Sequence, residues 1–234
     1  MRYFLTSPQL EQFPELKHAF TTTLLKDDYD RIAVKLKVLT SQVYYVEQIH
    51  SNRVVYLSPS MSLADMPAAD AIVTDRKDVY IGVRTADCVP ILVFDPEHQV
   101  VAAIHAGYKG LLNGVIQNTL NLMIQSFSSR PDDLVVTIGP CICAEHYEVG
   151  QEVIDAFRDR CGERFAFTTR DSSKLYLDLN QTARMILEDC GVDSDNLEDL
   201  NLCTYEKDDL FFSYRRQREA AGRHFNCIGI LSDF

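Results

Sequence analysis

Two side chains that could do chemistry interrupt a long apolar stretch between residues 70 and 110. Cys88 follows the end of one apolar run, directly after Asp87, and His105 closes the next run. A thiolate is a nucleophile and a soft metal ligand, while an imidazole is a general base or a metal ligand. The pair therefore predicts either a metal site or a cysteine nucleophile with its base. Asp87 is predicted to support a metal-bound histidine or to carry a proton.

A third donor, His50, ends the segment Tyr44–His50, whose alternating pattern predicts a strand. Two imidazoles and one thiolate suit a zinc ion with three protein ligands and an open fourth position, the arrangement of catalytic zinc sites. Copper is the second candidate metal. We interpret Cys141 and Cys143 as a structural pair, because their spacing is too short for a C-x-x-C zinc knuckle.

Arginine side chains near the C-terminal end are candidates for binding phosphate. Arg215, Arg216 and Arg223 follow an aromatic run in an acidic protein, and forked guanidinium groups bind phosphate through paired charge-assisted hydrogen bonds. Arg53 is a fourth candidate. The alternative is a solvated basic stretch without a ligand. The common glycine-rich phosphate-binding motifs do not occur in the sequence.

The elements that must position these residues are two buried strands and a helix. The runs Val89–Phe94 and Val100–Ile104 are apolar and rich in β-branched residues, with a turn at Asp95-Pro96 between them. This pattern predicts a β-hairpin that carries the thiol and the imidazole to one region. Residues 111–127 repeat apolar side chains at helical spacing, which predicts a single helix.

The remaining apolar patterns mix strands and helices without regular alternation. They predict strands at 20–23, 79–83, 134–138 and 227–231, and helices at 30–39, 150–160 and 180–190. This mixture favours an α+β fold with mixed sheets over a doubly wound parallel sheet. With 234 residues, one domain over residues 1–234 is expected.

Composition excludes several classes of partner. The formal net charge of −11 disfavours binding of nucleic acid or of an anionic membrane surface. No apolar run approaches the roughly 20 residues that span a bilayer. The seven scattered cysteines and the absence of a signal-peptide pattern predict a cytoplasmic protein with reduced thiols. A small-molecule substrate is expected, and the oligomeric state is left open.

Several segments resemble those of the YfiH family, also called laccase-domain proteins, and they keep the order of that family over residues 40 to 231. They are Gln48–Val54, Asp70–Thr74, Thr85–Pro90, His105–Gly110, Ile138–Ile142, Tyr147–Gly150, Leu177–Leu179 and Phe211–Arg216. The resemblance implies that His50, Cys88 and His105 bind zinc. It also implies an α+β sandwich of mixed sheets with outer helices, similar to the catalytic domain of the cytotoxic necrotising factors.

The resemblance further implies an enzyme that acts on purine nucleosides. The implied reactions are phosphorolysis of adenosine, inosine, guanosine or methylthioadenosine, and deamination of adenosine. One alternative is a hydrolase or amidase acting on a peptidoglycan precursor, with Cys88 as nucleophile and His105 as base. A second is a polyphenol oxidase, for which six histidines are few. A third is a metal-bearing binding module without catalysis.

The sequence departs from the family pattern at four places. Residues 20–25 lack the arginine and the glycines that are usual there, and Tyr108-Lys109 replaces Trp-Arg. Glu206 stands where a cysteine is usual, and Ala221 stands where a threonine is usual. The three candidate metal ligands are unchanged.

Overall fold

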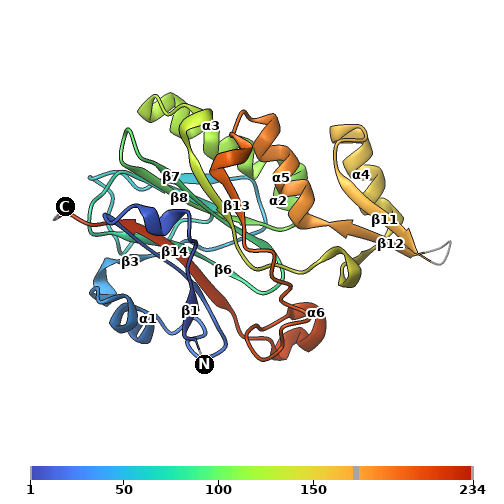
Figure 1. Ribbon diagram of the computed structural model, residues 1–234, viewed down its shortest axis with the longest axis horizontal. Coiled ribbons are helices and arrows are strands. Elements are labelled where there is room, and N and C mark those ends of the chain that lie inside the picture. Colours follow the sequence, from blue (N-terminus) through green and yellow to red (C-terminus); the bar gives the residue numbers. More distant parts are fainter. Residues whose placement is uncertain (1, 171–173, 233–234) are drawn as a thin grey trace.

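The computed structural model describes residues 2–170 and 174–232 and contains two stacked sheets with helices on their outer faces (Figure 1). The first sheet consists, in order, of β1 (Phe4–Leu5), β2 (Leu16–Thr21), β14 (His224–Ile230), β6 (Tyr80–Thr85) and β3 (Val43–Tyr44). The second consists of β13 (Leu197–Asp199), β9 (Val135–Ile138), β7 (Val89–Asp95), β8 (Val100–Ala106), β5 (Ala71–Thr74) and β4 (Val54–Tyr56). Both sheets combine parallel and antiparallel pairs. The predicted α+β sandwich of mixed sheets is therefore confirmed.

The predicted hairpin forms the centre of the second sheet, where β7 and β8 pair antiparallel and every residue is buried. Successive side chains point to opposite faces. Leu92, Phe94 and Val101 pack in the core shared with the first sheet, whereas Ile91 and Val93 pack in the core beneath the helices. Because both faces are covered, the two strands read as continuous apolar runs rather than as an alternation.

Helices cover both outer faces of the sandwich. α1 (Tyr29–Leu36) packs on the first sheet through Ile32 and Leu36. The second sheet is covered by α2 (Tyr108–Asn113), α3 (Val115–Phe127) and α5 (Leu179–Asp189). None of the helices in the described part of the chain combines the length and the apolar character that crossing a membrane requires.

A third, smaller sheet extends to one side, at the right of Figure 1. It consists of β10 (Glu148–Val149), β12 (Lys174–Asp178) and β11 (Ala166–Arg170), and α4 (Gln151–Cys161) lies beside it. The last helix, α6 (Tyr214–Gln217), precedes β14. The 3₁₀ turns are Leu10–Gln12, Thr40–Gln42, Pro131–Asp133, Ala144–His146, Ser194–Asn196 and Arg218–Ala220.

Two local predictions are wrong. The helix expected over residues 111–127 is two helices, because Gly114 adopts φ +89°, ends α2 and begins α3. The strand expected at Tyr44–His50 is limited to β3, and His50 lies in a loop with φ +57° rather than at a strand end. Side-chain alternation alone did not reveal that this segment leaves the sheet after Tyr44.

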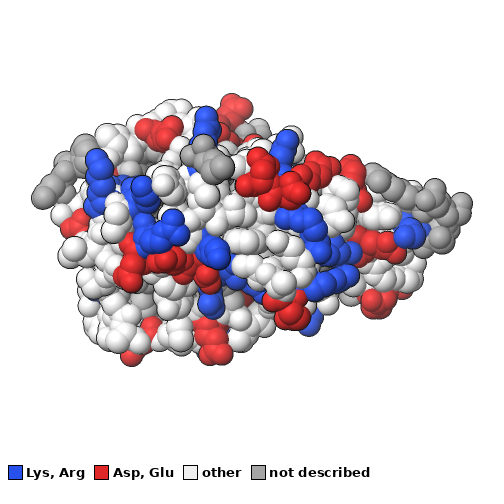
Figure 2. All heavy atoms as spheres, turned by 90° about the horizontal axis from the view of Figure 1, so that it is seen from below, with Lys and Arg blue, Asp and Glu red and all other residues white. Residues whose placement is uncertain are grey.

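Charged side chains of both signs are interspersed over the face seen from below in Figure 2. Lys and Arg are present there although the net charge of the chain is −11.

Candidate metal and substrate site

His50, Cys88 and His105 converge from three separate segments of the chain. Their ligand atoms all lie within 4.8 Å of one another, and the two imidazole ring centroids are 4.9 Å apart. His50 belongs to the loop before β4, Cys88 to the connection from β6 to β7, and His105 to β8. Three donors at these separations are within reach of a single metal ion.

The pairing of β7 with β8 explains how the thiol meets the imidazole. Pro90 lies opposite His105 in the ladder, so Cys88, just before β7, is level with the end of β8. Gly107 leaves the space that this approach needs. A Cβ atom at Gly107 would lie 2.9 Å from the Cys88 Sγ and 3.4 Å from the Cδ2 of His50.

Asp70 is the residue that holds two of these donors in place, and sequence reasoning assigned it no role. Its carboxylate is fully buried and lies 2.8 Å from the Nδ1 of His105. It also accepts hydrogen bonds from the main-chain N–H of His50 at 3.0 Å and of Ser51 at 2.5 Å. Burial opposes ionisation of this carboxyl, but hydrogen bonds from His105 and Ser51 outweigh it and lower the pKa of Asp70 to about 2.

The donor set therefore fits a metal ion. A histidine ligand usually gives its second ring N–H to a carboxylate, as His105 does to Asp70, which leaves Nε2 as its metal-binding atom. Burial disfavours the thiolate of Cys88, but the charge and hydrogen bonds of His105 and a hydrogen bond from His50 lower its pKa. Burial also disfavours the imidazolium of His105, but Cys88 and Asp70 raise its pKa. A divalent cation would replace the protons that the Cys88 thiol and the two imidazoles share through these hydrogen bonds.

These three donors line a pocket of about 620 Å³ together with two arginines, Arg84 and Arg223. The pocket also contains Tyr214, whose side chain is 39% exposed, and Glu219, which accepts a hydrogen bond from the Tyr214 hydroxyl. A volume of this size is typical of small-molecule sites. The pocket can therefore receive an anionic group near the three donors.

Arg84 is a pocket residue that sequence reasoning missed. It lies near the end of β6, where the side-chain amide of Gln48 bonds both its main-chain N–H, at 2.7 Å, and its carbonyl, at 2.8 Å. A charged residue within an otherwise apolar strand was the signal that could have identified it. Gln48, which lies two residues before His50, thus fixes the main chain of Arg84.

Among the four predicted arginines, which all lie in the described part of the chain, Arg223 alone lines this pocket. Arg53 lines a separate hollow beside α3. Arg215 stacks over the Tyr147 ring at 4.9 Å and donates to the carbonyl of Glu148. The Arg216 guanidinium donates to the main-chain carbonyls of Thr204, Tyr205 and Phe211. Through these hydrogen bonds, Arg216 fixes the loop between residues 204 and 211.

Asp87 does not contact the candidate metal ligand His105, whose carboxylate partner is Asp70. The Asp87 carboxylate accepts hydrogen bonds from the Thr204 hydroxyl at 2.7 Å, the Ser213 hydroxyl at 3.0 Å and the main-chain N–H of Arg215 at 2.6 Å. It therefore ties the C-terminal segment to the loop that carries Cys88. Asp87 is therefore not the carboxylate partner of His105, and its predicted role in carrying a proton stays a prediction.

The sequence matches known proteins over most of its length. The family described as "Multi-copper polyphenol oxidoreductase laccase" matches residues 22–231. A purine nucleoside phosphorylase of Bacteroides thetaiotaomicron is 36% identical over 75% of this chain and 66% of its own length. Another, of Clostridium acetobutylicum, is 34% identical over 80% of this chain and 76% of its own length.

A relative with a different named activity is also similar. A protein named adenosine deaminase, from an unknown prokaryotic organism, is 30% identical over 84% of this chain and 78% of its own length. Among solved structures, the hypothetical protein YfiH of Bacillus licheniformis has a TM-score of 0.89 at 25% identity, covering 98% of this chain and 100% of that one. The similarity therefore extends over both the sequence and the fold.

The residues present do not fit a multi-copper centre, which needs many histidine ligands. Only His50 and His105, of the six histidines that the structure describes, lie at the site. The other four have partners elsewhere: His18 with Ser7, His98 with Asp95, His146 with Glu206, and His224 with Phe212. The donor set instead suits one ion of the zinc class.

Proposed function

Because this chain belongs to the laccase-like YfiH family, we propose that it is a zinc-dependent purine nucleoside phosphorylase. The observation that carries the proposal is that three candidate metal donors and two arginine residues line one pocket. Phosphorolysis needs both an anion site and a site for the nucleoside within reach of each other. The relatives named purine nucleoside phosphorylase, at 34–36% identity, support the same reaction.

Arg84 and Arg223 are the residues that we assign to phosphate. Each guanidinium has five N–H donors, and the two carbonyls that Arg223 contacts, those of Ala221 and Gly222, both bind its Nη1. Its other nitrogens remain for an anion. Paired charge-assisted hydrogen bonds would hold the phosphate in the orientation for attack on the sugar C1′. The glycosidic C–N bond breaks as the new C–O bond forms, and the proton of monohydrogen phosphate leaves on the purine.

Tyr214 is the residue that we assign to the purine base. Its partly exposed ring lies in the pocket wall, with the Arg223 guanidinium 5.8 Å from its centroid. The hydrogen bond from its hydroxyl to Glu219 fixes the ring for offset stacking against a flat base. His50, Cys88 and His105 would hold the metal, and bound zinc would supply Lewis acidity at its open position.

Adenosine deamination is the second candidate, since a relative 30% identical to this chain is named adenosine deaminase. Water would then take the place of phosphate, and ammonia would leave the base. Cytoplasmic location and a single domain over residues 1–234 stay predictions.

The test is turnover of adenosine, inosine, guanosine and methylthioadenosine with and without phosphate. We expect phosphate-dependent release of free base in wild-type protein. Arg84→Gln and Arg223→Gln should each raise the KM for phosphate about tenfold or more, while the bound zinc is unchanged, because arginine donates hydrogen bonds but is not a ligand here.

Arg53→Gln is the matched control, since Arg53 lines a different hollow and should leave the phosphate KM unchanged. The phosphorylase proposal fails if base release is independent of phosphate. The arginine assignment fails if neither pocket variant changes the phosphate KM. Release of ammonia from adenosine without phosphate would favour the deaminase.

A further inference from the structure

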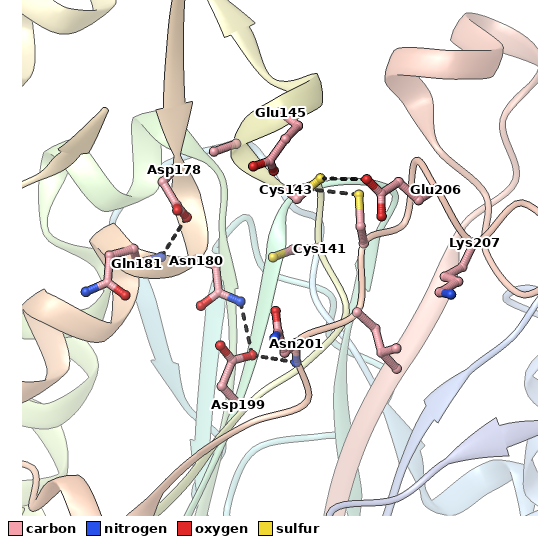
Figure 3. Close-up of a pocket in the computed structure, with 13 residues that line it drawn as sticks. Cys141, Cys143, Glu145, Asp178, Asn180, Gln181, Asp199, Asn201, Glu206 and Lys207 are labelled. Carbon is pink, nitrogen blue, oxygen red and sulfur yellow. Dashed lines mark hydrogen bonds between the residues drawn. The ribbon is translucent and has the colours of Figure 1, made fainter. Parts of the chain in front are cut away.

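A second group of candidate metal donors lies outside the site described above. One ligand atom from each of Cys143, Cys203 and Glu206 lies within 4.8 Å of the other two. The Cys143 Sγ is 3.8 Å from a carboxylate oxygen of Glu206, and its main-chain N–H donates to the Cys203 Sγ at 3.3 Å. Figure 3 shows the sulfur of Cys143 and the carboxylate of Glu206 directed toward each other at one side of a pocket.

An imidazole borders this group. The Nε2 of His146 is 3.2 Å from the same carboxylate oxygen of Glu206 that the Cys143 thiol contacts. The His146 ring stacks on Tyr205, with centroids 4.2 Å apart, and belongs to the 3₁₀ turn that follows Cys143. The two thiols and the carboxylate are close enough to share one ion. The imidazole lies beside the carboxylate and would complete a tetrahedral set of zinc ligands.

The main chain sets the separation of these donors. Cys141 and Cys203 form a parallel β-bridge, in which Cys141 donates to the carbonyl of Leu202 at 3.2 Å and Thr204 donates to the carbonyl of Cys141 at 2.9 Å. This register brings the segment that follows β9 alongside the segment that follows β13. Residues 200–213, all within the described chain, contain no helix or strand apart from this bridge. A cross-link would therefore stabilise the conformation of residues 200–213, which regular secondary structure does not hold.

The charge of the surrounding pocket favours a cation. The pocket has a volume of about 510 Å³, and its charged lining residues are four acids and one base: Glu145, Asp178, Asp199, Glu206 and Lys207. Cys143 is partly exposed there, and Cys203 is buried behind it. Two thiolates beside this excess of carboxylates would repel one another unless a cation were present.

We propose that Cys143, Cys203 and Glu206, with His146 as the fourth ligand, bind one divalent ion of the zinc class in a second, closed site. Each thiol gives up its proton as its sulfur binds the metal, so two protons leave per ion. Four protein ligands leave no open position, which is the arrangement of structural zinc sites. This site is separate from the His50, Cys88 and His105 group and does not depend on the function proposed above.

The ion would stabilise the approach to the first site. The two segments that it joins both hold Asp87: the Thr204 hydroxyl donates to its carboxylate at 2.7 Å, and the main-chain N–H of Ile142 donates to its carbonyl at 3.0 Å. Asp87 precedes Cys88 and has φ +93°, a conformation that needs support from its surroundings. A metal cross-link between these segments would supply that support.

The test uses the full chain, reduced and stripped of metal, in a Cys88→Ser background that removes the only thiol of the first site. Addition of Co²⁺ should produce a thiolate-to-cobalt charge-transfer band that saturates at one ion per chain. Addition of Zn²⁺ should then displace the bound Co²⁺ and abolish the band. Cys143→Ser or Cys203→Ser in this background should remove most of the band. Cys161→Ser, which changes a partly exposed cysteine at the end of α4, is the matched control and should leave it intact.

A variant at Glu206 keeps the test decisive if the cysteine variants misfold. The Glu206 side chain is 51% exposed, so Glu206→Gln should fold normally but bind Co²⁺ about tenfold or more weakly. Glu163→Gln, at a side chain that is 78% exposed, should bind as its parent does. Absence of the band in the Cys88→Ser protein, or an unchanged band in Cys143→Ser, would overturn the proposal. A Cys143–Cys203 disulfide in protein whose thiols were blocked at lysis would also overturn it.

Discussion

Asp70 shows how a single buried carboxylate organises the candidate site. It contacts a donor from β8 through the Nδ1 of His105 and a donor from the preceding loop through the main-chain N–H of His50. The second contact also supports His50 in its left-handed conformation at φ +57°. Asp70 thus fixes both the ring orientation of one ligand and the backbone of another, although it is not among the three donors.

Asp70→Asn should therefore weaken zinc binding by about 10- to 100-fold, the usual effect of removing a partner of a metal-bound histidine. Competition with a chromophoric chelator measures this affinity directly. Asp65→Asn, at an exposed aspartate a few residues earlier, is the control and should bind zinc as the wild type does. Equal affinity in the Asp70 and Asp65 variants would contradict the role assigned to Asp70.

Cys88 provides a prediction about pH. Burial alone would raise the pKa of its thiol, but the charge of His105 and hydrogen bonds from both histidines lower it to about 6. In metal-free protein, the rate of alkylation of Cys88 should therefore rise with pH up to about 6 and then level off, because the thiolate is the reactive form. Peptide mass spectrometry measures this rate. Cys161, whose pKa burial raises, should still gain reactivity above pH 9.

The same measurement separates the metal site from the cysteine hydrolase. Bound zinc should protect Cys88 from alkylation until a chelator removes it. A hydrolase with Cys88 as nucleophile would be labelled quickly without a chelator, and His50→Ala would retain most of its activity. Rapid labelling together with an active His50→Ala protein would exclude the zinc mechanism.

At the scale of elements, the hairpin of β7 and β8 and the paired helices α2 and α3 present the site. His105 lies near the end of β8, and α2 begins at Tyr108, directly after its N-cap residue Gly107. α2 ends at Gly114, whose left-handed backbone allows α3 to start in a new direction across the second sheet. The break therefore sets the direction of both helices behind the site.

Gly114→Ala should destabilise the protein by about 1–2 kcal/mol, because φ +89° crowds a Cβ against the backbone. Urea unfolding followed by circular dichroism measures the change. Ser126→Ala, at an exposed position of α3, should change stability by less than about 0.5 kcal/mol. A Gly114→Ala protein as stable as the wild type would show that the two helices do not require the left-handed residue.

At the scale of the whole molecule, two buried histidines join the terminal segments to the first sheet. The Nε2 of His18 in β2 accepts the main-chain N–H of Ser7, and the Nε2 of His224 in β14 accepts that of Phe212. Each ring must be neutral at Nε2 to accept, and burial lowers the pKa of both histidines to about 4.

Stability should consequently fall in mild acid. The unfolded chain binds protons at these histidines below about pH 6.5, whereas the folded protein resists protonation until about pH 4. The free energy of unfolding is therefore at its full value above pH 6.5 and falls as the pH approaches 4, by about 2–3 kcal/mol for each histidine by pH 4.5.

Urea unfolding at pH 7 and pH 4.5 tests this prediction in wild-type protein and in His18→Gln, which keeps a hydrogen-bond acceptor without a titrating group. The variant should lose less stability between the two pH values than the wild type. His98→Gln is the control. The His98 ring is 30% exposed, so this variant should lose as much stability between the two pH values as the wild type does. Equal pH dependence in the wild type and the His18 variant would refute the linkage.

Much of the site could be predicted from the sequence, because the strands that carry Cys88 and His105 are encoded by short stretches of neighbouring residues. Apolar runs identified β7 and β8, and the turn between them placed Cys88 and His105 in one region. Spacing alone could not show that His50 joins them. The zinc-type donor set suggested it, the resemblance to the YfiH family implied it, and the structure brings the three donors within 4.8 Å of one another.

The residues that contact these donors could not be predicted from the sequence, because they are brought together by the packing of distant elements. Asp70, and not Asp87, is the carboxylate partner of His105. Arg84 lines the pocket together with Arg223, and Cys143 lies beside Cys203, 60 positions away in the chain. Each of these contacts depends on which strands are neighbours, on their register and on left-handed residues in the loops. Periodicity reports which face of an element is buried, but it does not report which distant element covers that face.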